Sequence, residues 1–178
     1  GKKLSEMNSL LNAGCLAFSQ AKEPIFDTQI LFRAMQYAAT FGYSIHLQPE
    51  DHYLARDGVA HDGEVASRLG LADIPVCAET VAISTALQLA AETGVRLHFA
   101  RLSSAAGVAL VRKAKQQGVN VSCDVAVHHL HLSEVDIGYF DSSARVVPVL
   151  RQQRDRDALS AALADGTIDA LVSDHTPV

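Results

Sequence analysis

The chain has 178 residues, of which 48% are hydrophobic and 20% are charged, a composition typical of a folded globular protein. Its formal net charge of -5 leaves no basic surface that would bind nucleic-acid phosphates. No apolar run approaches the ~18 residues that a membrane span requires. We therefore expect neither a nucleic-acid partner nor a membrane association.

Strand-like and helical patterns alternate along the chain. In order, they predict a helix over 4–12, a strand over 15–19, a helix over 27–40, a strand over 43–48, a helix over 78–92, a strand over 96–100, a helix over 104–117, a strand over 120–125, a helix over 155–164 and a strand over 169–173. The strand runs are short and apolar, whereas the helical runs repeat apolar residues three or four positions apart. This alternation is typical of βα units that build a parallel sheet or barrel.

Cap and turn residues support these boundaries. Asp27 precedes one helical run, and Ser103 or Ser104 can cap another. Several predicted strands are preceded by a glycine, which can adopt the left-handed conformation that ends a helix. These glycines are Gly14, Gly42, Gly94 and Gly118.

Two segments interrupt the alternation, 49–70 and 127–148. Long connections that follow barrel strands lie at the catalytic face of barrel enzymes, so chemistry is to be sought in both. Five strands are too few for an eight-stranded barrel, which usually needs ~250 residues. We therefore expect residues 1–178 to form a single partial (β/α)-barrel domain.

The cysteines are far apart, odd in number and surrounded by apolar residues. Cys15, Cys77 and Cys123 are therefore expected to be buried free thiols of a reducing compartment. The first residues, Gly1 to Leu4, lack the apolar core of a secretory signal. The expected location is the cytoplasm.

Six sequence blocks, in order and at similar spacing, resemble the dihydroorotase family of the amidohydrolase superfamily. They are GVAHDGEVASRLGL (58–71), AET (78–80), HFARLSS (98–104), DVAVHHLHL (124–132), VPVLR (147–151) and DGTIDALVSDHTP (165–177). The likeness extends more loosely back to residue 1. It implies an α/β fold, the (β/α)8 TIM barrel of metal-dependent hydrolases, present here only in part.

The resemblance also implies a chemistry. Dihydroorotases interconvert carbamoyl-aspartate and dihydroorotate, using zinc held at the C-terminal ends of the barrel strands. Part of the zinc site in this branch is a histidine pair, H-x-H, on the first strand. That strand would lie upstream of Gly1, and the C-terminal end of the barrel would also be missing from residues 1–178.

At the first metal positions inside the chain, the sequence departs from the family. Gln20 stands where the family has an aspartate ligand, and Lys22 follows it closely. Anchored on Glu50, the next ligand histidine aligns with Gln48. His46 lies two residues earlier on the same strand face, so a shifted alignment would make it the ligand. The other interpretation of His46 is a histidine of the barrel core.

Arg101 occupies the position of a further ligand histidine, and a guanidinium has no lone pair to give to a metal. Asp174 keeps the position of the family's general base, which activates a metal-bound water. We expect Arg101 to pair with Asp174 and to replace the structural role of the metal. Two polar substrate contacts of the family are replaced as well, by Val147 and Val178. The sequence thus predicts a degenerate zinc site and no cofactor.

The densest histidine cluster is His128, His129 and His131. On a strand, His129 and His131 would share a face and could chelate a divalent ion. The resemblance favours the alternative, that these rings pack and form hydrogen bonds near the barrel mouth.

Other polar residues receive structural interpretations. His52 and His61 are expected to be solvated, and His98 to be a buried, hydrogen-bonded ring. Asp124 stands where the family often has a glutamate near the metal, so we expect it to join Arg101 and Asp174 in an internal ion-pair cluster.

Three functions follow from these patterns. The resemblance favours a catalytically inactive dihydroorotase-like protein of pyrimidine biosynthesis, which acts as a structural partner of aspartate transcarbamoylase in a homo- or hetero-oligomer. The second is an active zinc-dependent dihydroorotase that uses His46, Asp174 and the upstream histidine pair. The third is a metal-free binding protein in which Arg101 contacts a small anion.

Overall fold

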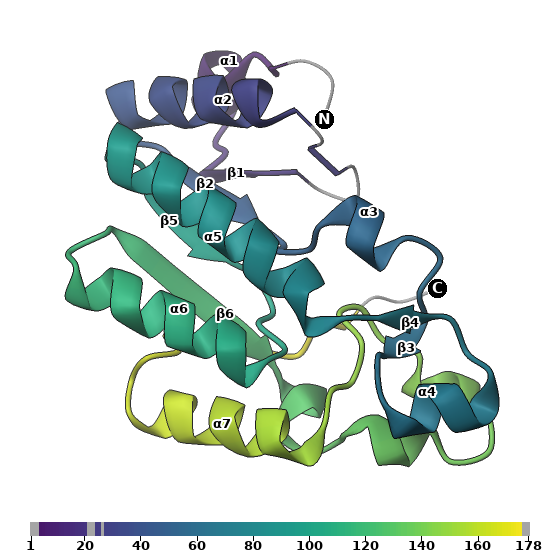
Figure 1. Cartoon of the computed structure of the whole chain (residues 1–178). Coiled ribbons are helices and arrows are strands. Elements are labelled where there is room, and N and C mark those ends of the chain that lie inside the picture. The colour runs from purple at the N-terminus through teal and green to yellow at the C-terminus, as the bar shows by residue number, and fades with distance from the viewer. Residues whose placement is uncertain (1–3, 21–23, 26, 176–178) are drawn as a thin grey trace.

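A parallel five-stranded sheet forms the centre of the computed structural model, which describes residues 4–20, 24–25 and 27–175 (Figure 1). The strands are β1 (Ala17–Ser19), β2 (Ser44–Leu47), β5 (Arg96–Phe99), β6 (Val121–Ala126) and β7 (Ala170–Val172), side by side in this order. Every pair of neighbours is parallel. Each strand overlaps a predicted one, so the predicted βα alternation is confirmed.

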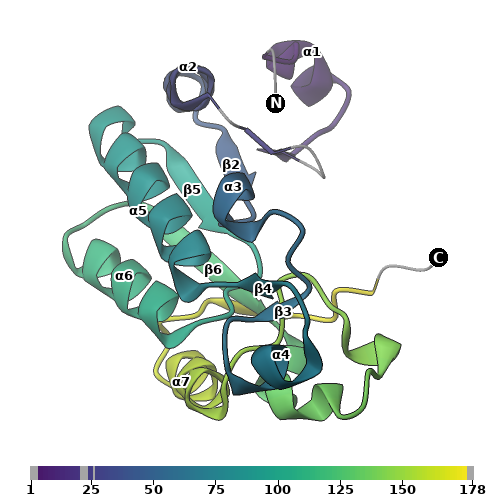
Figure 2. The ribbon, with the colours of Figure 1, turned by 45° about the vertical axis from the view of Figure 1, so that its right-hand side comes forward.

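Helices cover one face of this sheet. α2 (Thr28–Thr40), α5 (Val76–Thr93), α6 (Ala105–Gln116) and α7 (Gln153–Ala164) follow one another along it, and a short α1 (Met7–Asn12) precedes β1 (Figures 1 and 2). The predicted caps are present, because Asp27 accepts a hydrogen bond from the Gln29 backbone and Ser104 accepts one from the Gly107 backbone. The glycines that precede the strands have φ values of 99° (Gly14), 70° (Gly42), 70° (Gly94) and 81° (Gly118), as expected for left-handed turns.

The side chains of each strand alternate between two environments. Ile45 and Leu47 of β2, and Leu97 and Phe99 of β5, are buried against the helices. His46 and His98 lie between them in sequence, and so on the opposite face of the sheet, which faces the interior in a closed barrel. The apolar side chains of the strands therefore pack against the helices, and the polar side chains lie on the inner face of the sheet.

Both long connections contain short elements. Residues 49–75 contain α3 (His52–Ala55), β3 (Ala60–His61), α4 (Glu64–Leu69) and β4 (Asp73–Ile74), of which β3 and β4 form a separate parallel ribbon. Residues 127–148 contain three short 3₁₀ helices, η1 (Val127–Leu130), η2 (Glu134–Ile137) and η3 (Ser142–Ala144). Figure 1 shows the ribbon at the end of the sheet from which α5 begins, where strands β2, β5 and β6 terminate.

The cysteine prediction was only partly right. Cys123 is buried in β6, and burial raises the pKa of its thiol to about 12. Cys15 and Cys77 are free but exposed. Cys77 lies in the first turn of α5, and Cys15 precedes the edge strand β1. Neither side chain is therefore part of the core, although both cysteines have apolar neighbours in the sequence. Among the described helices, none combines the length and the hydropathy needed to cross a bilayer.

Candidate functional site

Arg101 is the centre of the polar contacts at the C-terminal ends of the strands. Its Nη1 donates to Oδ1 of Asp174 at 2.5 Å, and its Nη2 donates to Oε1 of Gln48 at 2.6 Å. Its backbone N–H donates to Oδ1 of Asp124 at 2.7 Å. The expected pairing of Arg101 with Asp174 is therefore present, while Asp124 binds the backbone of Arg101 rather than its guanidinium.

The backbone holds Arg101 firmly in this position. Its φ angle is 61°, in the left-handed region that residues other than glycine rarely adopt. The residues on either side extend the sheet pairing, because the Ala100 N–H donates to the Leu47 carbonyl and the Leu102 N–H to the Asp124 carbonyl, both at 2.9 Å. The left-handed turn thus directs the side chain of Arg101 across the strand ends.

A layer of polar side chains lies below this turn on the inner face. The rings of His46 and His98 contact each other with centroids 4.6 Å apart. His98 Nε2 donates to Asp124 at 2.9 Å, and its Nδ1 lies 2.8 Å from the hydroxyl oxygen of Ser122. The expectation of a hydrogen-bonded His98 is confirmed. His46 belongs to β2 and lies beside His98 in this layer, two residues before Gln48. Burial lowers the pKa of His46.

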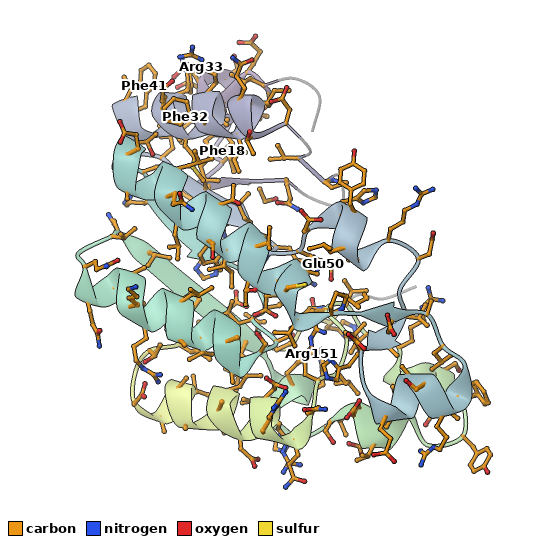
Figure 3. The ribbon with its side chains drawn as sticks, viewed as in Figure 1. Phe18, Phe32, Arg33, Phe41, Glu50 and Arg151 are labelled. Carbon is orange, nitrogen blue, oxygen red and sulfur yellow. The ribbon has the colours of Figure 1, made fainter. Side chains whose placement is uncertain are left out.

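A cavity of about 680 Å³ opens above Arg101 and Asp174. Figure 3 shows Glu50, one of its lining residues, near the N-terminal end of α5. Burial raises the pKa of Glu50, although the charges of Arg151 and Arg101 oppose this shift. The other residues that line the cavity are Gln20, Pro24, Gln48, His52, His128, Arg145, Val146 and Val147. A small molecule bound in this cavity would contact residues at the C-terminal ends of the strands.

The side chains at this site do not suit a divalent metal. The oxygens of Gln48 and Asp174 that would face a cation both accept hydrogen bonds from Arg101. The Nε atom of Arg101 is buried without a partner among the described residues, but a guanidinium nitrogen carries no lone pair for a metal. Within the described ranges, no three His, Cys, Asp or Glu side chains are grouped so that they could hold an ion.

The remaining predicted residues are spread over different environments. Val147 is 56% exposed at the cavity, whereas Val178 and Lys22 lie outside the described residues. His129 is buried and contacts the Val149 carbonyl through Nε2 at 3.3 Å, but His131 is exposed. Because these two histidines belong to a 3₁₀ turn and its end rather than to a strand, they do not share a face.

A second polar cluster was not recognised from the sequence. Glu79 of α5 is only 3% exposed, and its carboxylate accepts hydrogen bonds from the backbone N–H groups and the hydroxyls of Ser103 and Ser104. Burial raises the pKa of Glu79, and the hydrogen bonds from Ser103 oppose that shift. The sequence block AET contains this residue, and a glutamate within an apolar helical run was the available signal.

Arg151 connects this cluster to the β3–β4 ribbon. Its Nη1 donates to the Ile74 carbonyl at 2.5 Å and to Nδ1 of His61 at 3.2 Å, and its Nε lies 3.4 Å from the Ser103 hydroxyl oxygen. Figure 3 shows Arg151 at the end of α5 where the ribbon joins the main sheet. The prediction of a solvated His61 was wrong, because His61 is 3% exposed and burial lowers its pKa. His52, by contrast, is exposed as expected.

Comparison with known proteins points to one family. The family model described as dihydro-orotase-like matches residues 1–106. A dihydroorotase-like protein of Pseudomonas aeruginosa is 43% identical over 177 residues, which cover 99% of this chain and 42% of that protein. A dihydroorotase of Pelotomaculum thermopropionicum is 41% identical over 177 residues, with 99% of this chain and 42% of that protein covered. The chain therefore spans about two fifths of the length of these relatives.

Solved structures show the same fold over a similar share of their length. The L-hydantoinase of Arthrobacter aurescens superposes with a TM-score of 0.79 at 27% identity, covering 96% of this chain and 40% of the other. A dihydroorotase of Campylobacter jejuni superposes with a TM-score of 0.64 at 15% identity, covering 93% and 43%. The described sheet and its helices are thus a segment of a TIM barrel.

Proposed function

We propose that this chain, which belongs to the dihydroorotase family of the amidohydrolase superfamily, is part of a catalytically inactive member that acts in the cytoplasm as a structural partner of aspartate transcarbamoylase in pyrimidine biosynthesis. The observation that carries this proposal is the guanidinium of Arg101 at a position where the family has a metal-binding histidine. It donates to Gln48 and Asp174, two further positions of the family's site.

Asp174 supports the same conclusion. A general base must be able to accept a proton from a bound water, and its lone pairs must face that water. Here Oδ1 of Asp174 accepts a hydrogen bond from Arg101 at 2.5 Å, so this oxygen faces a guanidinium rather than a water. Val147 adds an apolar surface where the family places a polar substrate contact. Neither water activation nor substrate binding is supported by these side chains.

The catalytic half of the proposal is tested by metal analysis and by a dihydroorotate hydrolysis assay on the purified full-length protein. We expect far less than one zinc per chain and no turnover, with or without added zinc, because Arg101 occupies the coordination space. The Pelotomaculum dihydroorotase serves as a positive control in the same assay. Stoichiometric zinc together with turnover would instead establish an active dihydroorotase, in which His46 and Asp174 contribute to a site completed by residues outside this chain.

The structural half is tested by mixing the full-length protein with aspartate transcarbamoylase of the same organism. Size-exclusion chromatography with light scattering is expected to detect one larger species that contains both proteins. The activity and oligomeric state of the transcarbamoylase should also depend on its partner. Independent elution of the two proteins at micromolar concentration would contradict the partnership. The inactive protein would then have a different role.

A further inference from the structure

Arg101 connects the ends of four neighbouring strands. Gln48 follows β2, Arg101 follows β5, Asp124 belongs to β6, and Asp174 follows β7. These strands are adjacent in the order β2, β5, β6, β7. Arg101 therefore contacts residues that follow β2 and β7 through its guanidinium, and a residue in the C-terminal half of β6 through its backbone.

The guanidinium is chemically suited to this connection. It is planar and presents several N–H donors in a fixed arrangement, so it can bind two acceptors on different strands at once. The side chains of Arg101 and Asp174 are 24% and 18% exposed, which shields their ion pair from solvent more than a surface pair. By comparison, the side chains of the surface pair Arg56 and Asp57 are 69% and 85% exposed.

The backbone conformation indicates that an arginine is present at position 101 because of the contacts that its side chain makes. At a φ of 61°, glycine is the residue without steric cost, and a long side chain is disfavoured. An arginine that only filled a turn would be better replaced by glycine. Strain of this kind persists where the surrounding contacts over-determine the conformation, as the bonds to Gln48, Asp124 and Asp174 do here.

We infer that Arg101 is an internal cation that substitutes for a metal as the cross-link between the strand ends, so that this end of the barrel folds without any bound metal. The inference rests on the proposed function in one respect, namely that the metal position is not filled by zinc. It goes further by assigning Arg101 a stabilising role rather than a merely disruptive one.

Two substitutions at position 101 separate a cross-link from a turn residue. Arg101→Gly relieves the left-handed backbone but removes the guanidinium, whereas Arg101→Met removes the charge and keeps the strain. If Arg101 is the cross-link, both variants of the full-length protein melt several degrees below the wild type. If Arg101 only occupies a turn, Arg101→Gly melts at or above the wild-type temperature, and the inference is wrong.

Asp57→Gly is the matched control. Asp57 has the same φ of 61°, but its side chain is 85% exposed. This variant is expected to melt at or slightly above the wild-type temperature. Gln48→Ala is a milder variant that removes one acceptor of the cross-link and keeps the ion pair. It is expected to melt below the wild type, and a wild-type melting temperature for Gln48→Ala would contradict the cross-link even if the variants at position 101 do not fold.

Metal dependence is measured on the same samples. The melting temperature of the wild type is expected to stay unchanged when a chelator or zinc chloride is added. A wild type that loses several degrees with the chelator would overturn the inference, since a metal would then be the cross-link. Failure of the proposed function is distinguishable, because it appears as zinc and dihydroorotate turnover, whereas failure of this inference alone appears as an Arg101→Gly variant of wild-type stability.

Discussion

At the scale of single residues, four histidines share one physical property. Burial is the largest cause of a lowered pKa for His46, His61, His128 and His129. A charged imidazole loses hydration in these positions, so the folded protein favours the neutral ring. His129 is the strongest case, with a pKa lowered to about 4 and 2% of the residue exposed.

The pH dependence of stability follows from His129. Its unfolded pKa is near 6.5 and its folded pKa is about 4, so the unfolded chain binds the proton first as the pH falls. The stabilisation is complete above pH 6.5 and is lost progressively as the pH falls to about 4. We expect this residue to contribute on the order of 3 kcal/mol to that loss.

The measurement is the free energy of unfolding in urea across this pH range. His129→Gln keeps a donor for the Val149 carbonyl but does not titrate, so its stability should fall less steeply with decreasing pH than that of the wild type. His131→Gln changes an exposed ring two residues away and should retain the wild-type slope. Equal slopes for the wild type and His129→Gln would show that burial does not shift this titration.

At the scale of elements, the buried cluster around Glu79 joins parts that are far apart in sequence. Glu79 lies in α5, its seryl donors Ser103 and Ser104 lie between β5 and α6, and Arg151 precedes α7. Gly107 of α6 completes the contact, because a Cβ atom at this position would collide with Oε1 of Glu79. The absence of a side chain at Gly107 lets the carboxylate reach the start of α6.

Removing this carboxylate is expected to weaken the fold strongly. Glu79→Ala leaves the serine donors unpaired and deprives buried Arg151 of a nearby negative charge, a loss of about 3–5 kcal/mol. Glu92→Ala, an exposed change in the same helix, should change stability by less than about 0.5 kcal/mol. Chemical denaturation of both variants tests this expectation, and similar midpoints for the two would contradict a structural role for Glu79.

At the scale of the whole molecule, local patterns were sufficient for the order and type of the main elements. The capping residue Asp27, the glycines before the strands and the apolar periodicity each predicted features that the structure contains. They were sufficient because these signals act over a few residues. The partial barrel followed from the alternation and from the resemblance to the dihydroorotase family.

Contacts between distant segments could not be predicted in the same way. The sequence patterns gave no sign that His61 would be buried against Arg151, a residue 90 positions later. The β3–β4 ribbon consists of two-residue strands, too short for any periodicity to be visible. At the candidate site, the pairing of Arg101 with Asp174 was predictable because both stand at positions defined by the family, whereas the bond to Gln48 required the structure.

The cross-link by Arg101 has a consequence for how the protein matures. A metalloprotein leaves the ribosome incomplete and must acquire its ion, in competition with every other zinc-binding protein of the cell. A guanidinium is synthesised with the polypeptide, so the strand ends can be joined as soon as the chain folds. We expect the cellular level of this protein and its readiness to assemble to be insensitive to zinc starvation, even where active relatives in the same family depend on zinc supply.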